Sequence, residues 1–191
     1  MSSEEPSVTT GVDEVFDRLV SEGLNPARMA GASDSEINSW ASEQGVSTIP
    51  AGVRESLRLI GSEPGLWFAG SSFGVRTVTG AAKRHALATI TNLPETQLDS
   101  NGMLVLVEHQ AYEYHVIDGA DLSEPDPPVW LVTENRSAVP YWPSVTAWFE
   151  YGAPKVADYR FRLKSMRKRG KHTDPIWLSY FNFDDQSSPD R

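Results

Sequence analysis

The stretch GVSTIPAGVRESLR, residues 45–58, joins two predicted helices by a very short connection. Gly45 is suited to end the first helix, because glycine readily adopts the left-handed conformation that follows a helical C-terminus. Pro50 is suited to begin the second helix, since its fixed φ and missing N–H fit the first helical position. Apolar residues then recur at helical spacing at Val53, Leu57 and Ile60. The stretch therefore predicts a tight corner between two helices.

The segment before this corner has strong helix-start chemistry. Ser33 can accept a hydrogen bond from a free backbone N–H, and Glu36 stands three residues later, as a capping box requires. Ile37 and Trp40 lie on the same side of the predicted helix. We expect Ile49, within the corner, to enter the core beside Trp40.

The 191-residue chain contains no cysteine. Disulfides and thiolate metal sites are therefore excluded. The N-terminal residues lack the basic and apolar regions of a signal peptide. The longest aliphatic run, Met103–Val107, is too short to span a bilayer. We expect a cytoplasmic protein that has no membrane partner.

The net charge of −9 is unevenly distributed. Residues 154–173 contain eight Lys or Arg and one acidic residue, which gives +7 and leaves −16 for the rest. An acidic body argues against direct binding of nucleic acid and favours a cationic partner. Alternatively, the negative charge only keeps the protein soluble. The basic run Lys164–Lys171 could contact phosphate, but a solvated turn between two terminal strands is the more ordinary expectation.

The remaining sequence predicts short helices and strands separated by glycine-rich turns. Helices are expected at Val12–Glu22, Ala81–Leu93 and, capped by Ser144, Val145–Gly152. Strands are expected at Gly65–Gly70, Val75–Thr79, Met103–His109, Tyr112–Ile117, Val129–Thr133, Tyr159–Leu163 and Ile176–Phe183. The third and fourth of these strands would form a hairpin, although Gln110 and Ala111 make an unfavourable turn pair.

These elements predict an α+β fold in which N-terminal helices pack on a mostly antiparallel twisted sheet. A short closing helix and a strand-like C-terminal extension complete the prediction. Residues 12–183 are expected to form a single domain. The polar segments 1–11 and 184–191 are expected to be disordered tails.

The sequence SDSEINSWASEQGVSTIPAGVRESLR, residues 33–58, resembles the N-terminal signature of the SUKH superfamily. The residues that carry the resemblance are Glu36-Ile37, Glu43, Gly45, Ile49-Pro50, Val53-Arg54 and Leu57. Looser similarity continues through Met103–Val107 and Pro128–Val132 to the segment Ser144–Phe149, so the resemblance covers residues 33–152. The basic extension, residues 153–183, has no counterpart in the pattern.

The resemblance implies a non-enzymatic binding module. Bacterial members of the superfamily are immunity proteins that bind and neutralise a cognate toxin, often a nuclease or a deaminase. Fungal members regulate cell-wall synthesis, so a cell-wall or regulatory scaffold is the alternative. The resemblance transfers no contact residue to this chain, because contact residues differ from partner to partner.

Gly70–Gly74, GSSFG, matches the nucleophile elbow G-x-S-x-G, with Ser72 as the candidate nucleophile. A small serine hydrolase is therefore a second alternative function. An elbow needs a helix directly after the serine, to orient its hydroxyl and supply an oxyanion N–H. The sequence that follows predicts a strand instead, so we expect a glycine-serine loop and no enzymatic activity.

Two histidines and a glutamate, His109, Glu113 and His115, could bind zinc if the hairpin register places them on one side. A solvated polar face of a half-buried sheet is the simpler expectation. We therefore expect neither a metal nor another cofactor.

The expected partner is a toxin domain with a basic surface. Carboxylates of an inhibitor can occupy the places where substrate phosphates would lie. Trp142 lies in a predicted Pro-Tyr-Trp-Pro loop, where it would be either an exposed contact anchor or a buried plug. The predicted partner-binding residues are Glu108, Tyr112, Glu113, Asp118, Asp121, Glu124, Asp126 and Trp142.

Overall fold

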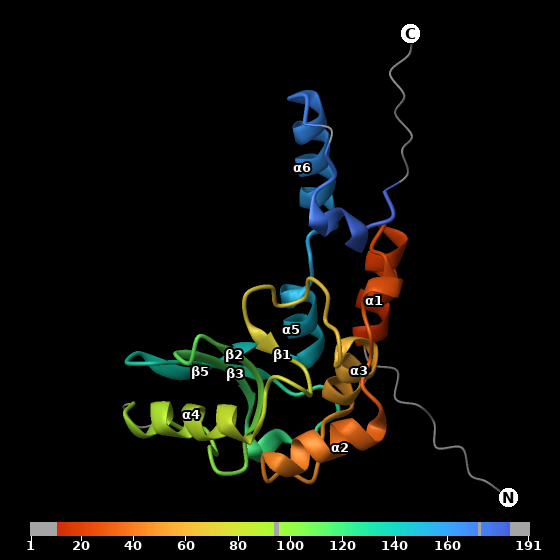
Figure 1. Cartoon of the computed structure of the whole chain (residues 1–191). Helices are drawn as coiled ribbons and strands as arrows, with labels where there is room; N and C mark the ends of the chain where they lie inside the picture. Colours follow the sequence, from red (N-terminus) through yellow and green to blue (C-terminus); the bar gives the residue numbers. More distant parts are fainter. Residues whose placement is uncertain (1–10, 94–95, 172, 184–191) are drawn as a thin grey trace, which may run out of the picture.

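The fold is an open antiparallel sheet with helices on both of its faces (Figure 1). The computed structural model describes residues 11–93, 96–171 and 173–183. The helices are α1 (Gly11–Ser21), α2 (Asp34–Glu43), α3 (Ala51–Ile60), α4 (Gly80–Thr91), α5 (Val145–Gly152) and α6 (Val156–Lys168). Short 3-10 turns are η1 (Pro26–Arg28), η2 (Gly119–Asp121) and η3 (Ile176–Tyr180). The strands are β1 (Ser72–Phe73), β2 (Leu104–His109), β3 (Glu113–Ile117), β4 (Val129–Thr133) and β5 (Ser137–Trp142).

The strands pair in the order β1-β2-β3-β4-β5, and every neighbouring pair is antiparallel. The predicted α+β class is therefore confirmed. No helix in the described part of the chain is long and apolar enough to cross a membrane. The expected tails at residues 1–10 and 184–191 lie outside the described residues, and Gly11 already belongs to α1.

Two apolar cores lie on opposite faces of the sheet. The larger core joins the sheet to α1, α3 and α5, and the smaller core lies between the sheet and α4. Trp40, Leu57 and Trp148 all belong to the larger core, as predicted. Ile49 packs against that core but stays partly exposed.

The helical corner forms nearly as its sequence predicts. Ser33 Oγ accepts the Glu36 backbone N–H at 3.3 Å, and Glu36 Oε2 accepts the Ser33 N–H at 2.8 Å, which completes the capping box. Gly45 has a φ of +70°, in the left-handed region. Pro50 stands one position before its predicted place, because its extended ψ of 143° makes it the N-cap of α3.

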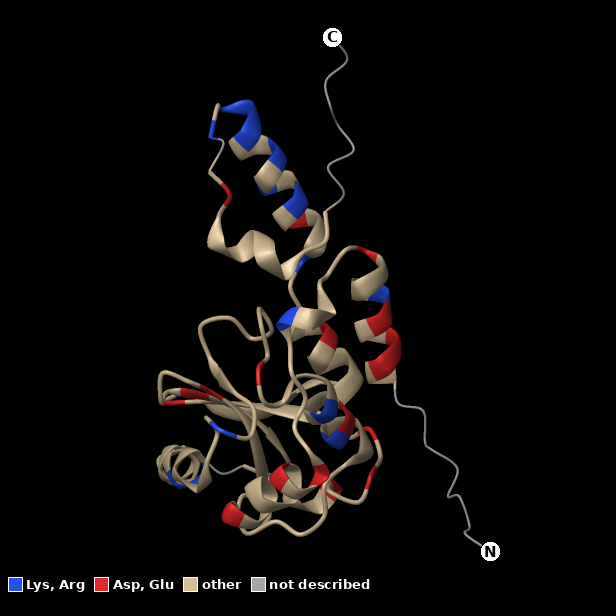
Figure 2. Cartoon of the chain, turned by 45° about the vertical axis from the view of Figure 1, so that its right-hand side comes forward, with Lys and Arg blue, Asp and Glu red and all other residues tan. Residues whose placement is uncertain are grey.

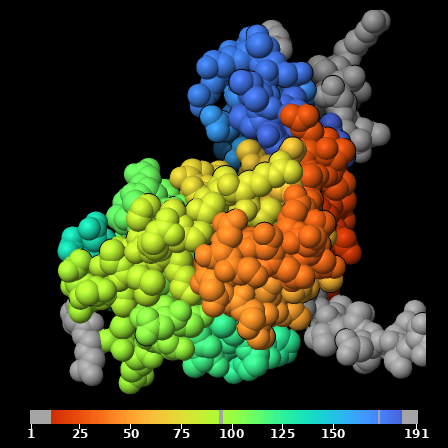
Figure 3. Space-filling model, turned by 60° about the horizontal axis from the view of Figure 1, so that its bottom comes forward, coloured from red at the N-terminus to blue at the C-terminus, as the bar shows by residue number. Residues whose placement is uncertain are grey.

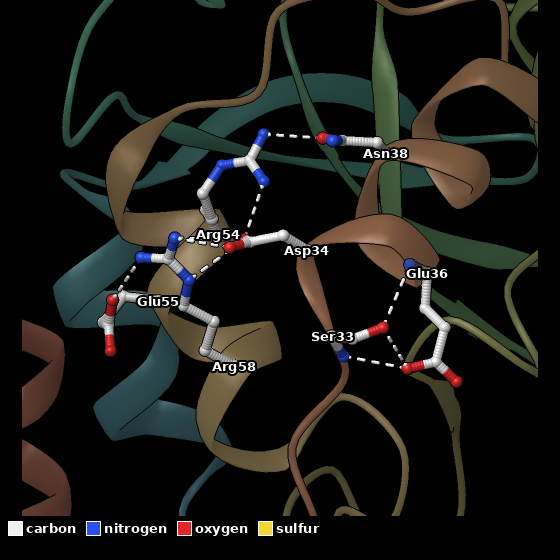
Figure 4. A network of polar contacts seen from close by, with 7 residues as sticks. All are labelled: Ser33, Asp34, Glu36, Asn38, Arg54, Glu55 and Arg58. Atoms are coloured by element: carbon white, nitrogen blue, oxygen red, sulfur yellow. Dashed lines mark hydrogen bonds and ion pairs between the residues drawn. The ribbon is translucent and has the colours of Figure 1, made fainter.

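A network of polar contacts clamps α3 to α2 on the outside of the corner (Figure 4). Arg58 holds both carboxylate oxygens of Asp34 at 3.1 and 3.0 Å, and Arg54 donates to Asp34 and Asn38 at 3.1 and 2.9 Å. The hydrogen bonds from Arg58 and Arg54 hold the pKa of Asp34 below its usual value. The clamp is solvent-exposed, so it fixes orientation more than it adds stability.

Gln44, directly after α2, connects the helical corner to the sheet. Its buried side chain pairs with the Val105 backbone: Oε1 accepts the N–H at 2.9 Å, and Nε2 donates to the carbonyl at 3.1 Å. The side chain thus supplies the hydrogen bonds that a neighbouring strand would form with Val105, because β1 pairs with β2 only at Val107 and Glu108. The Gln44 carbonyl in turn accepts a hydrogen bond from the buried Lys83 of α4 at 2.6 Å, which links α4 to the end of α2. In the space-filling view the segment that contains α2 (orange) lies beside the segment that contains α4 (yellow-green) (Figure 3).

Gln44→Leu should lower the free energy of unfolding by about 2–4 kcal/mol. Two buried backbone groups of Val105 would lose their partner, and each such loss costs roughly 1–3 kcal/mol. Urea denaturation would measure the change, with Gln97→Leu, at an exposed glutamine, as the control that should stay near wild type. Equal stability of the two variants would contradict the bridging role.

The segment between α3 and α4 does not form the two predicted strands, Gly65–Gly70 and Val75–Thr79. It forms turns, and only Ser72–Phe73 between them joins the sheet as β1. Trp67 is buried because its ring stacks between Phe16 and Phe149, at centroid distances of 5.8 and 5.1 Å. Apolar residues here thus pack by aromatic stacking rather than by strand alternation.

The predicted strand-like C-terminal extension is also wrong. Residues 156–168 form α6, and η3 replaces the last predicted strand. Tyr159 and Leu163 are four residues apart, so they match a helical period as well as the alternation that suggested a strand. The many Lys and Arg side chains of this segment have good helix propensity, which favours the helix.

The predicted Pro-Tyr-Trp-Pro loop is instead part of β5, at the edge of the sheet. Pro140 is tolerated there because an edge strand leaves some backbone groups unpaired by neighbours. Trp142 is 7% exposed, so the structure selects the buried alternative for this side chain.

Candidate functional site

A patch of exposed aromatic residues covers the open end of the sheet face beside α5. Tyr112, Val139, Tyr141 and Tyr151 are between 39% and 63% exposed. The rings of Tyr141 and Tyr151 both contact the buried Trp142 ring, at centroid distances of 4.7 and 5.1 Å. We call Tyr112, Val139, Tyr141, Trp142 and Tyr151 the tyrosine face.

An open cavity of about 550 Å³ lies at the base of the tyrosine face. Tyr112 and Tyr151 line it together with residues from the turn before β1, from the β2–β3 hairpin and from the end of α5. The polar groups that reach it are Ser71, His109, Glu113, His115, Glu150 and Lys155. The cavity therefore combines two aromatic walls with groups of both charges.

A serine and a histidine are hydrogen-bonded within this cavity. Ser71 Oγ lies 2.9 Å from His109 Nδ1, and the Tyr112 ring contacts the His109 ring edge to face at 5.3 Å. The G-x-S-x-G match pointed to Ser72, which pairs with Glu108 in the sheet. The helix that an elbow requires does not follow, since residues 74–79 form turns. The motif therefore lies in a loop that reaches the cavity, but the serine that is hydrogen-bonded to a histidine is Ser71 rather than Ser72.

His115 supports the site from within the sheet and is 6% exposed. Its Nδ1 accepts the indole N–H of Trp148 at 3.0 Å, so the ring proton belongs on Nε2, which faces Glu113 Oε1 at 3.7 Å. Burial, with a smaller contribution from His109, lowers the pKa of His115 to about 3. His115 is thus a neutral scaffold residue beneath the Trp142 ring, 4.5 Å away.

His115 should make the protein acid-sensitive. Because the unfolded chain binds a proton near pH 6.5 and the folded one only near pH 3, stability is full above pH 6.5 and falls with pH below it. Between pH 7 and pH 5 this group should remove about 2 kcal/mol from the free energy of unfolding. In His115→Gln the side chain can still accept the Trp148 indole N–H. Urea titrations at both pH values should show that the free energy of unfolding of this variant falls by about 2 kcal/mol less between pH 7 and pH 5 than that of the wild type. Identical pH dependence in the two proteins would contradict this assignment.

The hairpin register does place His109, Glu113 and His115 on one face, because His109 pairs with Glu113 and Val107 with His115. The two imidazoles are nevertheless occupied by Ser71 and Trp148. Within the described residues, no group of three or more His, Asp or Glu side chains is placed to hold a metal ion.

The eight predicted partner-binding residues do not form one surface. Tyr112 and Glu113 line the cavity, and Trp142 is the buried ring of the tyrosine face. Glu108 points to the opposite face of the sheet, where its Oε1 contacts His85 Nδ1 of α4 at 3.0 Å. The sheet therefore separates Glu108 from the other three residues.

The remaining four predicted residues follow the far end of β3, and the rise of this strand separates the first of them, Asp118, from Glu113 by about 17 Å. Asp118 is buried, and its Oδ1 accepts the backbone N–H groups of Asp99 and Ala120. Asp126 accepts the Thr146 N–H at 2.9 Å near the start of α5. These two carboxylates stabilise loops, whereas Asp121 and Glu124 are partly or fully exposed.

One residue that lines the cavity has an unusual backbone conformation. Phe68 has a φ of +48°, in the left-handed region that a bulky side chain rarely adopts. Gln110 and Ala111 also have positive φ values, of +48° and +58°, but they are the central residues of the turn from His109 to Tyr112, and a type I′ hairpin turn requires this conformation at both positions. Asn135 is the remaining non-glycine residue with positive φ in the described part of the chain. Alternation and composition alone do not reveal the conformation of Phe68.

Comparison of the chain with protein-family models, with curated proteins and with solved structures found no match. Two features of the described residues bear on function: the tyrosine face and the Ser71–His109 hydrogen bond.

Proposed function

We propose that this chain is a non-enzymatic binding module that holds a protein partner on its tyrosine face. One observation carries the proposal. Six large apolar side chains are exposed in the described residues, and four of them gather on this face. Contiguous exposed apolar surface of this kind is typical of interaction sites.

The residue types of the tyrosine face suit protein recognition. Tyrosine and tryptophan are enriched among residues that dominate binding energy, because they offer much contact area at a low cost in side-chain entropy. Trp142 and His115 support the exposed rings from below, so little ordering is needed when a partner binds. The adjacent cavity offers room for a side chain of the partner.

We further propose that the partner is a cognate toxin and that the chain acts as its immunity protein in the cytoplasm. The resemblance to the SUKH superfamily and the acidic body support this role. Carboxylates are crowded enough that burial and the neighbouring Glu55 raise the pKa of Asp13. A strong negative field speeds the approach of a basic toxin even when the contacts themselves are apolar. A cell-wall or regulatory scaffold of the same superfamily is the alternative.

The double variant Tyr141→Ser/Tyr151→Ser should abolish protection in cells that co-express the product of the neighbouring reading frame. Each anchor of this type is worth about 2 kcal/mol or more, so the affinity for that product should fall at least about 100-fold. Calorimetry with the purified pair measures the affinity, and colony counts measure protection. Phe161→Ser, at a more exposed aromatic residue on α6, is the control that should protect fully.

Full protection by the double variant would contradict the tyrosine face as the binding surface. A neighbouring product that does not slow growth in the absence of the chain would contradict the immunity role. Binding of that product through the tyrosine face without any toxicity would favour the scaffold alternative.

A serine hydrolase is the second candidate function, and the Ser71–His109 hydrogen bond is the observation that favours it. Among the described residues, however, no carboxylate is hydrogen-bonded to His109 to orient it as a base. We therefore expect a fluorophosphonate probe to leave the protein unlabelled. Labelling that is lost in Ser71→Ala and retained in Ser72→Ala would overturn this expectation and establish Ser71 as a nucleophile.

A further inference from the structure

The C-terminal segment forms a basic arm, which we define as residues 155–171. α6 projects away from the sheet, and Lys and Arg are distributed along it (Figures 1 and 2). Asp158 is the single acidic residue in this range. The cations of the arm are Lys155, Arg160, Arg162, Lys164, Arg167, Lys168, Arg169 and Lys171, and all of them are exposed.

The arm is held in place by a small aromatic cluster of its own. The Tyr159 ring lies 5.1 Å from Trp177 and 4.8 Å from Phe181. The chain then returns to the body, where the Asn182 N–H donates to the Gly23 carbonyl at 2.7 Å. The direction of α6 is therefore fixed by packing on one side and by backbone hydrogen bonds at its base.

The cations near the base of the arm have structural contacts. Arg160 donates to the Glu22 carbonyl at 2.6 Å, and the Arg162 guanidinium lies over the Trp177 ring at 5.7 Å. Lys164, Lys168 and Lys171, further out, form no ion pair or side-chain hydrogen bond within the described residues. Their charges are therefore available to an external ligand.

We propose that the basic arm binds the phosphate backbone of nucleic acid. Lys164 and Lys168 are one helical turn apart, about 6 Å, so they present a row of cations to one polyanion. The net charge of −9 is the sum of +7 on residues 154–173 and −16 on the rest of the chain. The net negative charge therefore does not exclude binding of a polyanion by the basic arm. The projection of α6 keeps the positive part clear of the acidic body (Figure 2).

The packing of α6 favours nucleic acid over a membrane surface. A helix that lies on a membrane needs an exposed apolar face opposite its cations. In α6 the apolar residues Val156 and Leu163 are buried, with Tyr159 packed on the aromatic cluster. Phe161 on this helix and Ile176 on η3 are the two exposed large apolar residues of the described C-terminal segment, and two such side chains are too little surface to insert. Phosphate contacts require only the cations that the arm presents.

The triple variant Lys164→Gln/Lys168→Gln/Lys171→Gln of the full chain tests the proposal. Fluorescence anisotropy with a labelled 20-base-pair DNA duplex of mixed sequence should give a wild-type Kd on the order of 10⁻⁴–10⁻⁶ M at physiological salt. The triple variant should bind roughly tenfold more weakly or worse. The slope of log K against log salt should also fall by up to about 2.7, since each lost phosphate contact contributes about 0.9.

The matched control is Arg76→Gln/Arg84→Gln/Arg136→Gln, which removes the same charge from exposed positions of the body. It should bind the duplex like wild type. Equal weakening by the two triple variants would show a general charge effect and overturn the proposal, as would a wild-type protein that does not bind the duplex at 50 mM salt. Sedimentation with vesicles of one-third phosphatidylserine adds a third check, since binding of vesicles but not of DNA would assign the arm to membranes. The tyrosine-face variants leave the arm intact, so failure here is distinguishable from failure of the proposed function.

Discussion

The pairing of the Gln44 side chain with the Val105 backbone is the interaction on which the rest of the structure depends. The two residues are 61 positions apart, and both hydrogen bonds are buried. Through them the helical corner substitutes for a strand that β1 is too short to supply. Because Lys83 binds the Gln44 carbonyl, the same residue also fixes α4. Gln44 thus links both α2, which it follows, and α4 to the sheet.

Local chemistry explains which elements the sequence predicts well. The Ser33 capping box, the left-handed Gly45 and the Ser144 cap act within a few residues, so they are visible in any short window. The tyrosine face is different, because Tyr141 and Tyr151 meet only across Trp142, on separate elements. Likewise, Ser71 lies within hydrogen-bonding distance of His109 because β1 pairs with β2. Such contacts depend on sheet order, which no local pattern encodes.

Alternation along the C-terminal segment predicts a strand that does not form. Tyr159, Phe161 and Leu163 alternate as in a strand, yet two of them also fit a helix. In the structure Phe161 is 73% exposed, so the alternation did not reflect burial. The predicted partner-binding residues lie on separate parts of the molecule, because residues that are close along the chain need not be close in space. Asp118 and Glu113 flank the same strand but lie at its opposite ends.

The proline in the edge strand has a consequence for how this protein behaves in concentrated solution. An exposed edge next to exposed tyrosines would ordinarily invite a second chain to extend the sheet, and repeated extension leads to fibrils. Pro140 has no N–H to offer an incoming strand, so a continuous ladder cannot pass this position. The exposed tyrosines can therefore stand beside this edge of the sheet while Pro140 interrupts the pairing that would lead to polymerisation.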